Sequence, residues 1–142
     1  DNLKTINDTY GHDWGDVYLR QTAHSLQQGS PSGAVVARLS GDEFLLLFYG
    51  YETREALWAD IKKLEENFAQ SSAALPDGKR LCIRMSGGVA WYPEDALDLD
   101  TLKKYADFAM YEVKHSTKGE VREFDMERYR AGVYASGAAQ RL

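Results

Sequence analysis

Apolar positions along the chain recur with helical spacing in three segments. Leu19, Ala23 and Leu26 are spaced i, i+4, i+7, and this stripe ends at the glycine- and proline-containing segment 29–33. A second stripe keeps the same spacing opposite a row of charged residues, and a third spans about residues 100–116. The pattern therefore predicts three amphipathic helices. The expected inward positions of the last two are Leu57, Ile61, Leu64 and Phe68, and Leu102, Ala106, Ala109, Met110 and Val113.

Two short apolar runs without helical spacing predict a β-hairpin. The runs cover residues 34–39 and 44–49, and the four residues Ser40-Gly41-Asp42-Glu43 join them. Strand-like runs connected by a short glycine-containing segment are typical of hairpins. We refer to residues 40–43 as the hairpin tip.

Further strands are expected in the second half of the chain. Residues 81–92 alternate between apolar and polar positions and predict one strand, in which Gly87-Gly88 marks a bulge or a close backbone approach. Residues 71–79 predict a loop, and residues 121–124 predict a short strand. Because strands and helices mix without regular βαβ alternation, the expected fold is α+β, with an antiparallel-dominated sheet flanked by helices.

Length and composition are those of one soluble globular domain. The chain has 142 residues, 44% of them hydrophobic and 27% charged, and its apolar runs are far shorter than the roughly 20 residues of a membrane-spanning helix. Seventeen basic and 22 acidic residues give a net charge of −5, which argues against binding a nucleic acid polymer or an anionic membrane surface. A single cysteine is compatible with a reducing compartment such as the cytoplasm.

The hairpin tip is the first candidate for chemistry. Asp42 and Glu43 are adjacent carboxylates between two stiff strands. Mg²⁺ is commonly bound by one or two carboxylates together with substrate phosphates, and Gly41 would let a ligand come close. The alternative is that these residues are ordinary, solvated hairpin-turn residues.

A second candidate is the polar segment 7–16, which we expect to be a loop leading into a helix. Residues 1–8 are expected to be the exit of a strand and the start of this loop. Asn7 and Asp16 present amide and carboxylate groups that suit the hydrogen-bonding edge of guanine. The alternative is that they serve as loop and helix-capping residues.

A third candidate is the lysine pair Lys114 and Lys118 near the end of the third expected helix. Lysines at a helix C-terminus complement the helix dipole. They can also bind phosphates as point charges.

Four spaced blocks together resemble one known family. In order, they read N-D-x-x-G-H-x-x-G-D over residues 7–16, R-x-S-G-D-E-F over residues 38–44, S-x-G-V-A-x-Y-P over residues 86–93, and A-D-x-A-M-Y-x-x-K over residues 106–114. This set is similar to the GGDEF family of diguanylate cyclases, over residues 1 to about 125. The resemblance implies a nucleotidyl-cyclase or polymerase-palm type of fold, which is ferredoxin-like. Residues 126–142 would be a linker or helical tail.

The resemblance also implies an activity and a set of site residues. The family condenses two GTP molecules into cyclic di-GMP and two pyrophosphates, with Mg²⁺ or Mn²⁺, at the interface of a homodimer. The guanine-binding residues would be Asn7 and Asp16. The metal-binding and catalytic residues would be Asp42 and Glu43, in a signature turn that also contains Ser40, Gly41 and Phe44, with Arg38 preceding it. The phosphate-binding residues would be Asn2, Leu3, Lys4, Lys114 and Lys118.

The chain departs from the family pattern at four places. Ser40 replaces the first glycine of the signature, and the product-inhibition motif Arg-x-x-Asp is absent at residues 31–34. A first metal-binding aspartate would lie two residues before Asp1, on a strand that a longer parent would supply. Asn2-Leu3 stands where an aromatic residue is common, and Lys118 replaces an arginine, which removes a bidentate phosphate contact.

Three functions follow from these features as alternatives. The first is an active diguanylate cyclase domain of a bacterial signalling protein. The second is a degenerate GTP-binding module that regulates a neighbouring domain, and the third is a structural dimerising segment. A sensor domain upstream and a phosphodiesterase domain downstream would fit the first two. The domain itself is expected in the cytoplasm, although the parent protein could be anchored in a membrane.

Overall fold

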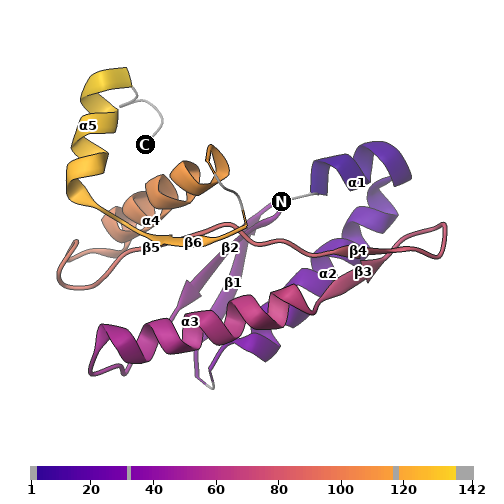
Figure 1. Cartoon of the computed structure of the whole chain (residues 1–142), viewed down its shortest axis with the longest axis horizontal. Helices are drawn as coiled ribbons and strands as arrows, with labels where there is room; N and C mark the ends of the chain where they lie inside the picture. The colour runs from indigo at the N-terminus through magenta and orange to yellow at the C-terminus, as the bar shows by residue number, and fades with distance from the viewer. Residues whose placement is uncertain (1–2, 32, 117–118, 137–142) are drawn as a thin grey trace. The chain divides into compact units, whose positions relative to one another are not determined.

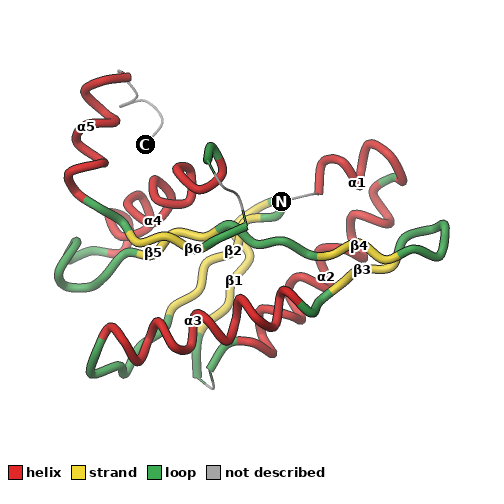
Figure 2. Tube along the Cα trace, viewed as in Figure 1, coloured by secondary structure: helices red, strands yellow, loops and turns green. Residues whose placement is uncertain are grey.

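Two compact units make up the chain, residues 1–84 and residues 85–142, in the computed structural model shown in Figures 1 and 2. The structure describes residues 3–31, 33–116 and 119–136. Within these ranges, no helix is both long enough and apolar enough to cross a membrane.

The first unit begins with two helices that meet at a single glycine. Helix α1 covers Leu3–Tyr10 and helix α2 covers His12–Gly29. Between them, Gly11 has a φ of 95°, a conformation that residues with a side chain rarely adopt. The Gly11 N–H donates to the Asn7 carbonyl (3.0 Å), and the Gly15 N–H donates to the Gly11 carbonyl (3.2 Å), so the backbone is hydrogen-bonded through the corner.

This corner corrects the sequence-based prediction of a loop over residues 7–16. The strand exit predicted over residues 1–8 is helical from residue 3, and residues 1 and 2 lie outside the described residues. Within residues 7–16, only Gly11 lies outside the helices, since Asn7 belongs to α1 and Asp16 to α2. Asn and Asp favour loops because their side chains compete for backbone hydrogen bonds. Here that preference is overridden because α1 packs on α2 and buries Ile6, which is 2% exposed.

Helix α3 (Arg54–Ala69) has the inward face that its spacing predicts, with Leu57, Ile61, Leu64 and Phe68 buried. Polar contacts join it to α2. The Asn67 side chain donates to the Ser25 carbonyl (2.8 Å), and the Ser25 hydroxyl donates to that of Ser71 (2.9 Å). Ser25 is buried, so these bonds satisfy polar groups that are removed from water.

Two antiparallel ladders complete the first unit. Strands β1 (Val35–Ser40) and β2 (Glu43–Leu47) form the predicted hairpin. Strands β3 (Ser72–Ala74) and β4 (Arg80–Cys82) form a second hairpin, where the sequence predicts a loop before one long strand. The expected strand over residues 81–92 is instead divided, because its first part pairs with β3 and its later part has a different partner.

The second unit contains that later part. Strand β5 (Gly87–Val89) pairs in parallel with β6 (Val121–Glu123), and both contact helix α4 (Leu99–Lys114). The α+β class with mostly antiparallel pairing is therefore confirmed, as is the short strand near residues 121–124.

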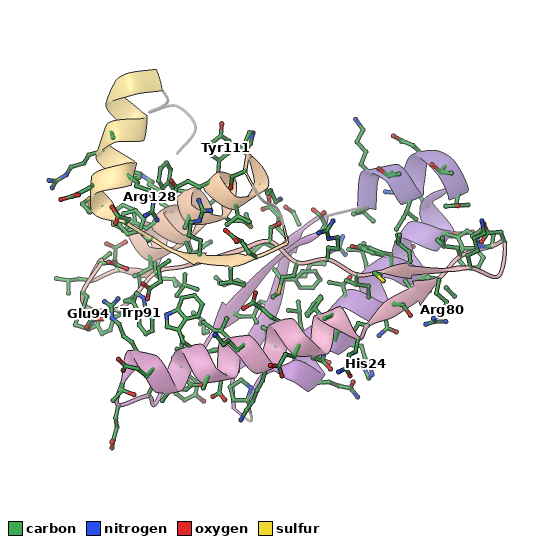
Figure 3. The ribbon with its side chains drawn as sticks, viewed as in Figure 1. His24, Arg80, Trp91, Glu94, Tyr111 and Arg128 are labelled. Atoms are coloured by element: carbon green, nitrogen blue, oxygen red, sulfur yellow. The ribbon has the colours of Figure 1, made fainter. Side chains whose placement is uncertain are left out.

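Helix α5 (Met126–Ser136) is held to α4 and to the end of β6 by aromatic and charged side chains. Tyr129 packs edge-on against Phe108 and Tyr105, with ring centroids 5.1 and 5.2 Å apart. The Arg128 guanidinium donates to the Glu112 carboxylate at 3.1 Å (Figure 3 labels Arg128). The tail is thus helical over these residues and docked on its own unit.

The contact between β5 and α4 requires a glycine. A Cβ atom at Gly88 would overlap the backbone oxygen of Ala106 and lie 2.6 Å from the backbone nitrogen of Met110. The close backbone approach that Gly87-Gly88 predicts is therefore present, and it occurs at the second glycine. At Gly87, by contrast, the three atoms nearest to a Cβ atom would all belong to the Val121 side chain, at 3.3 Å or more.

We expect Gly88→Ala to lower the free energy of unfolding by at least about 2 kcal/mol, since backbone atoms cannot yield to an added methyl group as side chains can. Gly87→Ala is the matched control, and it should cost clearly less because a valine side chain can shift. Chemical denaturation of both variants tests this. Equal losses would contradict the close approach at Gly88.

The start of α4 gives the structure a pH-dependent contact. The Asp98 carboxylate accepts from the Thr101 N–H (2.8 Å) and from the Thr101 hydroxyl (2.8 Å), and these hydrogen bonds lower the pKa of Asp98 below its ordinary 3.8. A lowered pKa in the folded state means that the stabilisation is present above the unfolded value and is lost as the pH falls through the folded value.

We therefore expect Asp98→Asn to flatten the loss of stability below about pH 4, because asparagine caps a helix well but does not titrate. The measurement is the free energy of unfolding from pH 7 to pH 2 for both proteins. Parallel acid profiles would show that the Asp98 cap adds nothing to acid sensitivity.

Candidate functional site

The hairpin tip holds two adjacent carboxylates, Asp42 in its turn and Glu43 at the start of β2. Ser40 pairs with Glu43 across the ladder, and the register shifts between Arg38 and Ser40, so the turn itself consists of Gly41 and Asp42. Asp42 is half-buried and Glu43 is exposed. The predicted position of both acids at the tip is confirmed.

An arginine fixes this turn. The Arg38 Nε donates to the Gly41 carbonyl at 2.8 Å. Gly41 has a φ of 48°, which favours glycine, whereas Ser40 is the last residue of β1 and has strand backbone. The serine that replaces the family's first glycine thus occupies a position where the backbone does not demand glycine.

The corner between α1 and α2 brings the two expected guanine-binding residues onto neighbouring turns. Asn7 lies directly against Gly15, where even a Cβ atom would overlap the Asn7 Oδ1. Asp16 is the next residue and is exposed. An amide and a carboxylate therefore flank the first turns of α2.

The first turn of α1 has the features of an anion-binding helix end. Leu3 and Lys4 are its first residues, and the turn contains no acidic residue. Backbone N–H groups at a helix N-terminus lack helical partners and favour negative charge. Lys4 is exposed. The expected contact at Asn2 lies outside the described residues.

The expected lysine pair belongs to the second unit. Lys114 is half-buried in the last turn of α4, where its charge complements the helix dipole. The following residue, His115, stacks on Tyr111 with ring centroids 3.9 Å apart (Figure 3 labels Tyr111). Lys118 lies outside the described residues.

A divalent cation would find only part of its ligands here. In the described ranges, no three His, Cys, Asp or Glu side chains converge. Asp42 and Glu43 supply hard carboxylate oxygens, and Mg²⁺ is usually held by one or two such groups together with substrate phosphates and water. The residues present therefore fit a cation that binds together with a phosphate-bearing substrate.

Sequence reasoning missed two residues that shape the site. The sequence predicts a loop at Gly15, which lies in α2, and it indicates no contact for Arg38, which holds the turn. The available signals were a glycine four residues after Gly11, just ahead of an apolar stripe, and a basic residue three positions before the turn glycine.

Comparison with known families gives one match to most of the chain. Residues 1–120 match the family model described as "Diguanylate cyclase, GGDEF domain". The chain is 36% identical over 122 residues to diguanylate cyclase DgcP of Escherichia coli, covering 83% of this chain and 34% of that protein. It is also 36% identical over 116 residues to the bifunctional diguanylate cyclase/cyclic di-GMP phosphodiesterase MucR of Pseudomonas aeruginosa, covering 80% and 16%. The chain thus spans about a third of the length of the first of these relatives and about a sixth of the second.

Solved structures agree with this match. The GGDEF domain of TpbB (YfiN) from Pseudomonas aeruginosa is similar with a TM-score of 0.82 and 30% identity, covering 89% of this chain and 78% of that one. The GGDEF domain of DgcB from Caulobacter crescentus, solved in complex with c-di-GMP, has a TM-score of 0.69 at 20% identity, with 87% and 72% covered. The second likeness shows the fold alone.

We expect Arg38→Met to loosen the hairpin tip, because the Gly41 carbonyl loses its side-chain donor. Backbone order parameters of Gly41 and Asp42 should fall below about 0.6, the range of flexible segments. The matched control is Arg80→Met, since Arg80 makes similar hydrogen bonds to Ser72 in the other hairpin. Unchanged order at the tip in Arg38→Met would contradict a clamping role.

Proposed function

Because this chain belongs to the GGDEF family of diguanylate cyclases, we propose that it is an active, Mg²⁺- or Mn²⁺-dependent domain that condenses two GTP molecules into cyclic di-GMP. The nucleotidyl-cyclase type of fold is shared with its relatives. The single observation that best supports activity is the intact hairpin tip, where Asp42 lies in a turn that Arg38 holds and Glu43 begins β2.

The proposed contacts to the base and to part of the phosphates use groups whose positions have been described. Asn7 and Asp16 accept the N–H groups of guanine from the turns around the α1–α2 corner. The N–H groups of Leu3 and Lys4, with the Lys4 ammonium, bind the phosphates. Membership of the family alone supports the same phosphate-binding role for Lys114, Asn2 and Lys118.

The reaction has two identical halves. The 3′-hydroxyl oxygen of one ribose attacks the α-phosphorus of the other GTP, and the bond from that phosphorus to the pyrophosphate oxygen breaks. Asp42 would assist removal of the hydroxyl proton, and Asp42 and Glu43 would hold the divalent cations. A bound divalent cation supplies charge neutralisation on the phosphates and lowers the hydroxyl pKa. Two such steps release two pyrophosphates and close the ring.

A homodimer is required by this scheme, since each domain holds one GTP.

The proposed domain spans residues 1–125, in the cytoplasm. Residues 126–142 act as a connector to a following domain, and α5 is its docked part. A relative such as MucR is itself named as a bifunctional cyclase and phosphodiesterase.

The second candidate is a degenerate GTP-binding module, and Ser40 is the observation that favours it. The added hydroxyl lies next to the turn where a nucleotide would approach. The position of Ser40, exposed at the end of β1, supports the active alternative instead, because no described backbone feature demands glycine there.

The test is incubation of the protein with GTP and MgCl₂, at concentrations that favour dimers, with mass spectrometry of the products. We expect cyclic di-GMP, and we expect Asp42→Ala to reduce its formation at least about 100-fold, because an acid at the metal and the hydroxyl contributes several kcal/mol. Asp77→Ala is the matched control, since Asp77 lies in the turn of the other hairpin, and it should retain activity.

The remaining outcomes separate the alternatives. GTP binding measured by calorimetry without any product would support the regulatory module. Absence of GTP binding at millimolar nucleotide would overturn both nucleotide-based functions and leave a structural segment.

A further inference from the structure

We infer that Gly15 is a positioning residue for base selectivity: by lacking a Cβ atom, it seats the Asn7 amide against α2 in the orientation that recognises guanine. This inference rests on the proposed function, since it concerns how the same site distinguishes one purine nucleotide from another.

The steric evidence is specific to one face of α1. A Cβ atom at Gly15 would overlap Asn7 Oδ1, lie 2.9 Å from Asn7 Cγ and lie 3.3 Å from Leu3 Cδ1. Leu3 and Asn7 are four residues apart, so they occupy the same face of α1. Both side chains therefore pack against α2 at Gly15, which is buried.

Gly15 is not required for its backbone conformation. It lies inside α2, where glycine is less favourable than alanine by about 1 kcal/mol, and it is not among the glycines with positive φ. Gly15 therefore weakens α2, and the contact with Asn7 that it permits explains why a glycine stands there.

Asn7 is anchored at the corner through its backbone, so an added methyl group at residue 15 would displace its side chain first. Its carbonyl accepts the Gly11 N–H, and the Gly11 carbonyl accepts the Gly15 N–H, so the three backbones are joined around the corner. A methyl group at residue 15 would consequently rotate the Asn7 amide away or lift α1. Either change removes an acceptor for the exocyclic amino group of guanine while leaving Asp16 in place.

The experiment measures the affinities of the protein for GTP and for inosine triphosphate, which lacks that amino group. We expect Gly15→Ala to lower the ratio of the two affinities about 10-fold, the effect of one lost hydrogen bond. Gly29→Ala is the structural control. It also crowds α2, against Leu64 and Asn67, but it lies far along the helix from Asn7, so it should lower stability without changing the ratio.

A double-mutant cycle with Asn7→Ala tests the route of the effect. If Gly15 acts through Asn7, the double variant should resemble Asn7→Ala. Adding Gly15→Ala to Asn7→Ala should then have little effect on the affinity ratio and on the free energy of unfolding. Additive effects on both quantities, or an unchanged ratio in Gly15→Ala, would overturn the inference while leaving the proposed function intact.

Failure of the proposed function would look different. If the unaltered protein binds neither nucleotide, both the function and the selectivity role are overturned. The coupling in unfolding free energy between Gly15 and Asn7 would then still measure the packing by itself.

Discussion

The position of α1 depends on a contact that only a residue without a side chain allows. At Gly15, α2 offers a bare backbone surface on which Asn7 and Leu3 of α1 rest. The same constraint recurs in the second unit, where Gly88 lets β5 lie against the backbone of α4. Close approaches of this kind are rigid because both partners include backbone or buried atoms, and they therefore place polar groups accurately.

The parts of the fold that the sequence predicted correctly are those with local signals. Helix α3 follows from the spacing of Leu57, Ile61 and Leu64, and the β1–β2 hairpin from two apolar runs around a short turn. Helix α1 was missed because its eight residues are marginal alone and are stabilised by packing on α2. The division of residues 81–92 was missed because alternation does not reveal where one ladder partner ends and another begins.

The candidate site divides in the same way. Asp42 and Glu43 were placed correctly because turn length is local information, and Lys114 was placed correctly at the end of α4. The contact of Asn7 with Gly15, the residue before Asp16, depends on a corner between two helices, which the polar residues of this segment do not indicate. In the proposed scheme, this corner binds the guanine base, the start of α1 binds the phosphates, and the hairpin tip carries the catalytic carboxylates. Three local structures therefore bind and activate one nucleotide.

Whether one nucleotide engages the corner and the tip together is the most direct test of that claim. It can be measured by titrating the isotope-labelled protein with a non-hydrolysable GTP analogue and Mn²⁺, and following the amide signals by NMR. The proposed site predicts chemical-shift changes at Gly15 and Asp16 and paramagnetic broadening at Asp42 and Glu43, with one shared dissociation constant. Broadening at the tip without any change at the corner, or two unrelated dissociation constants, would contradict it.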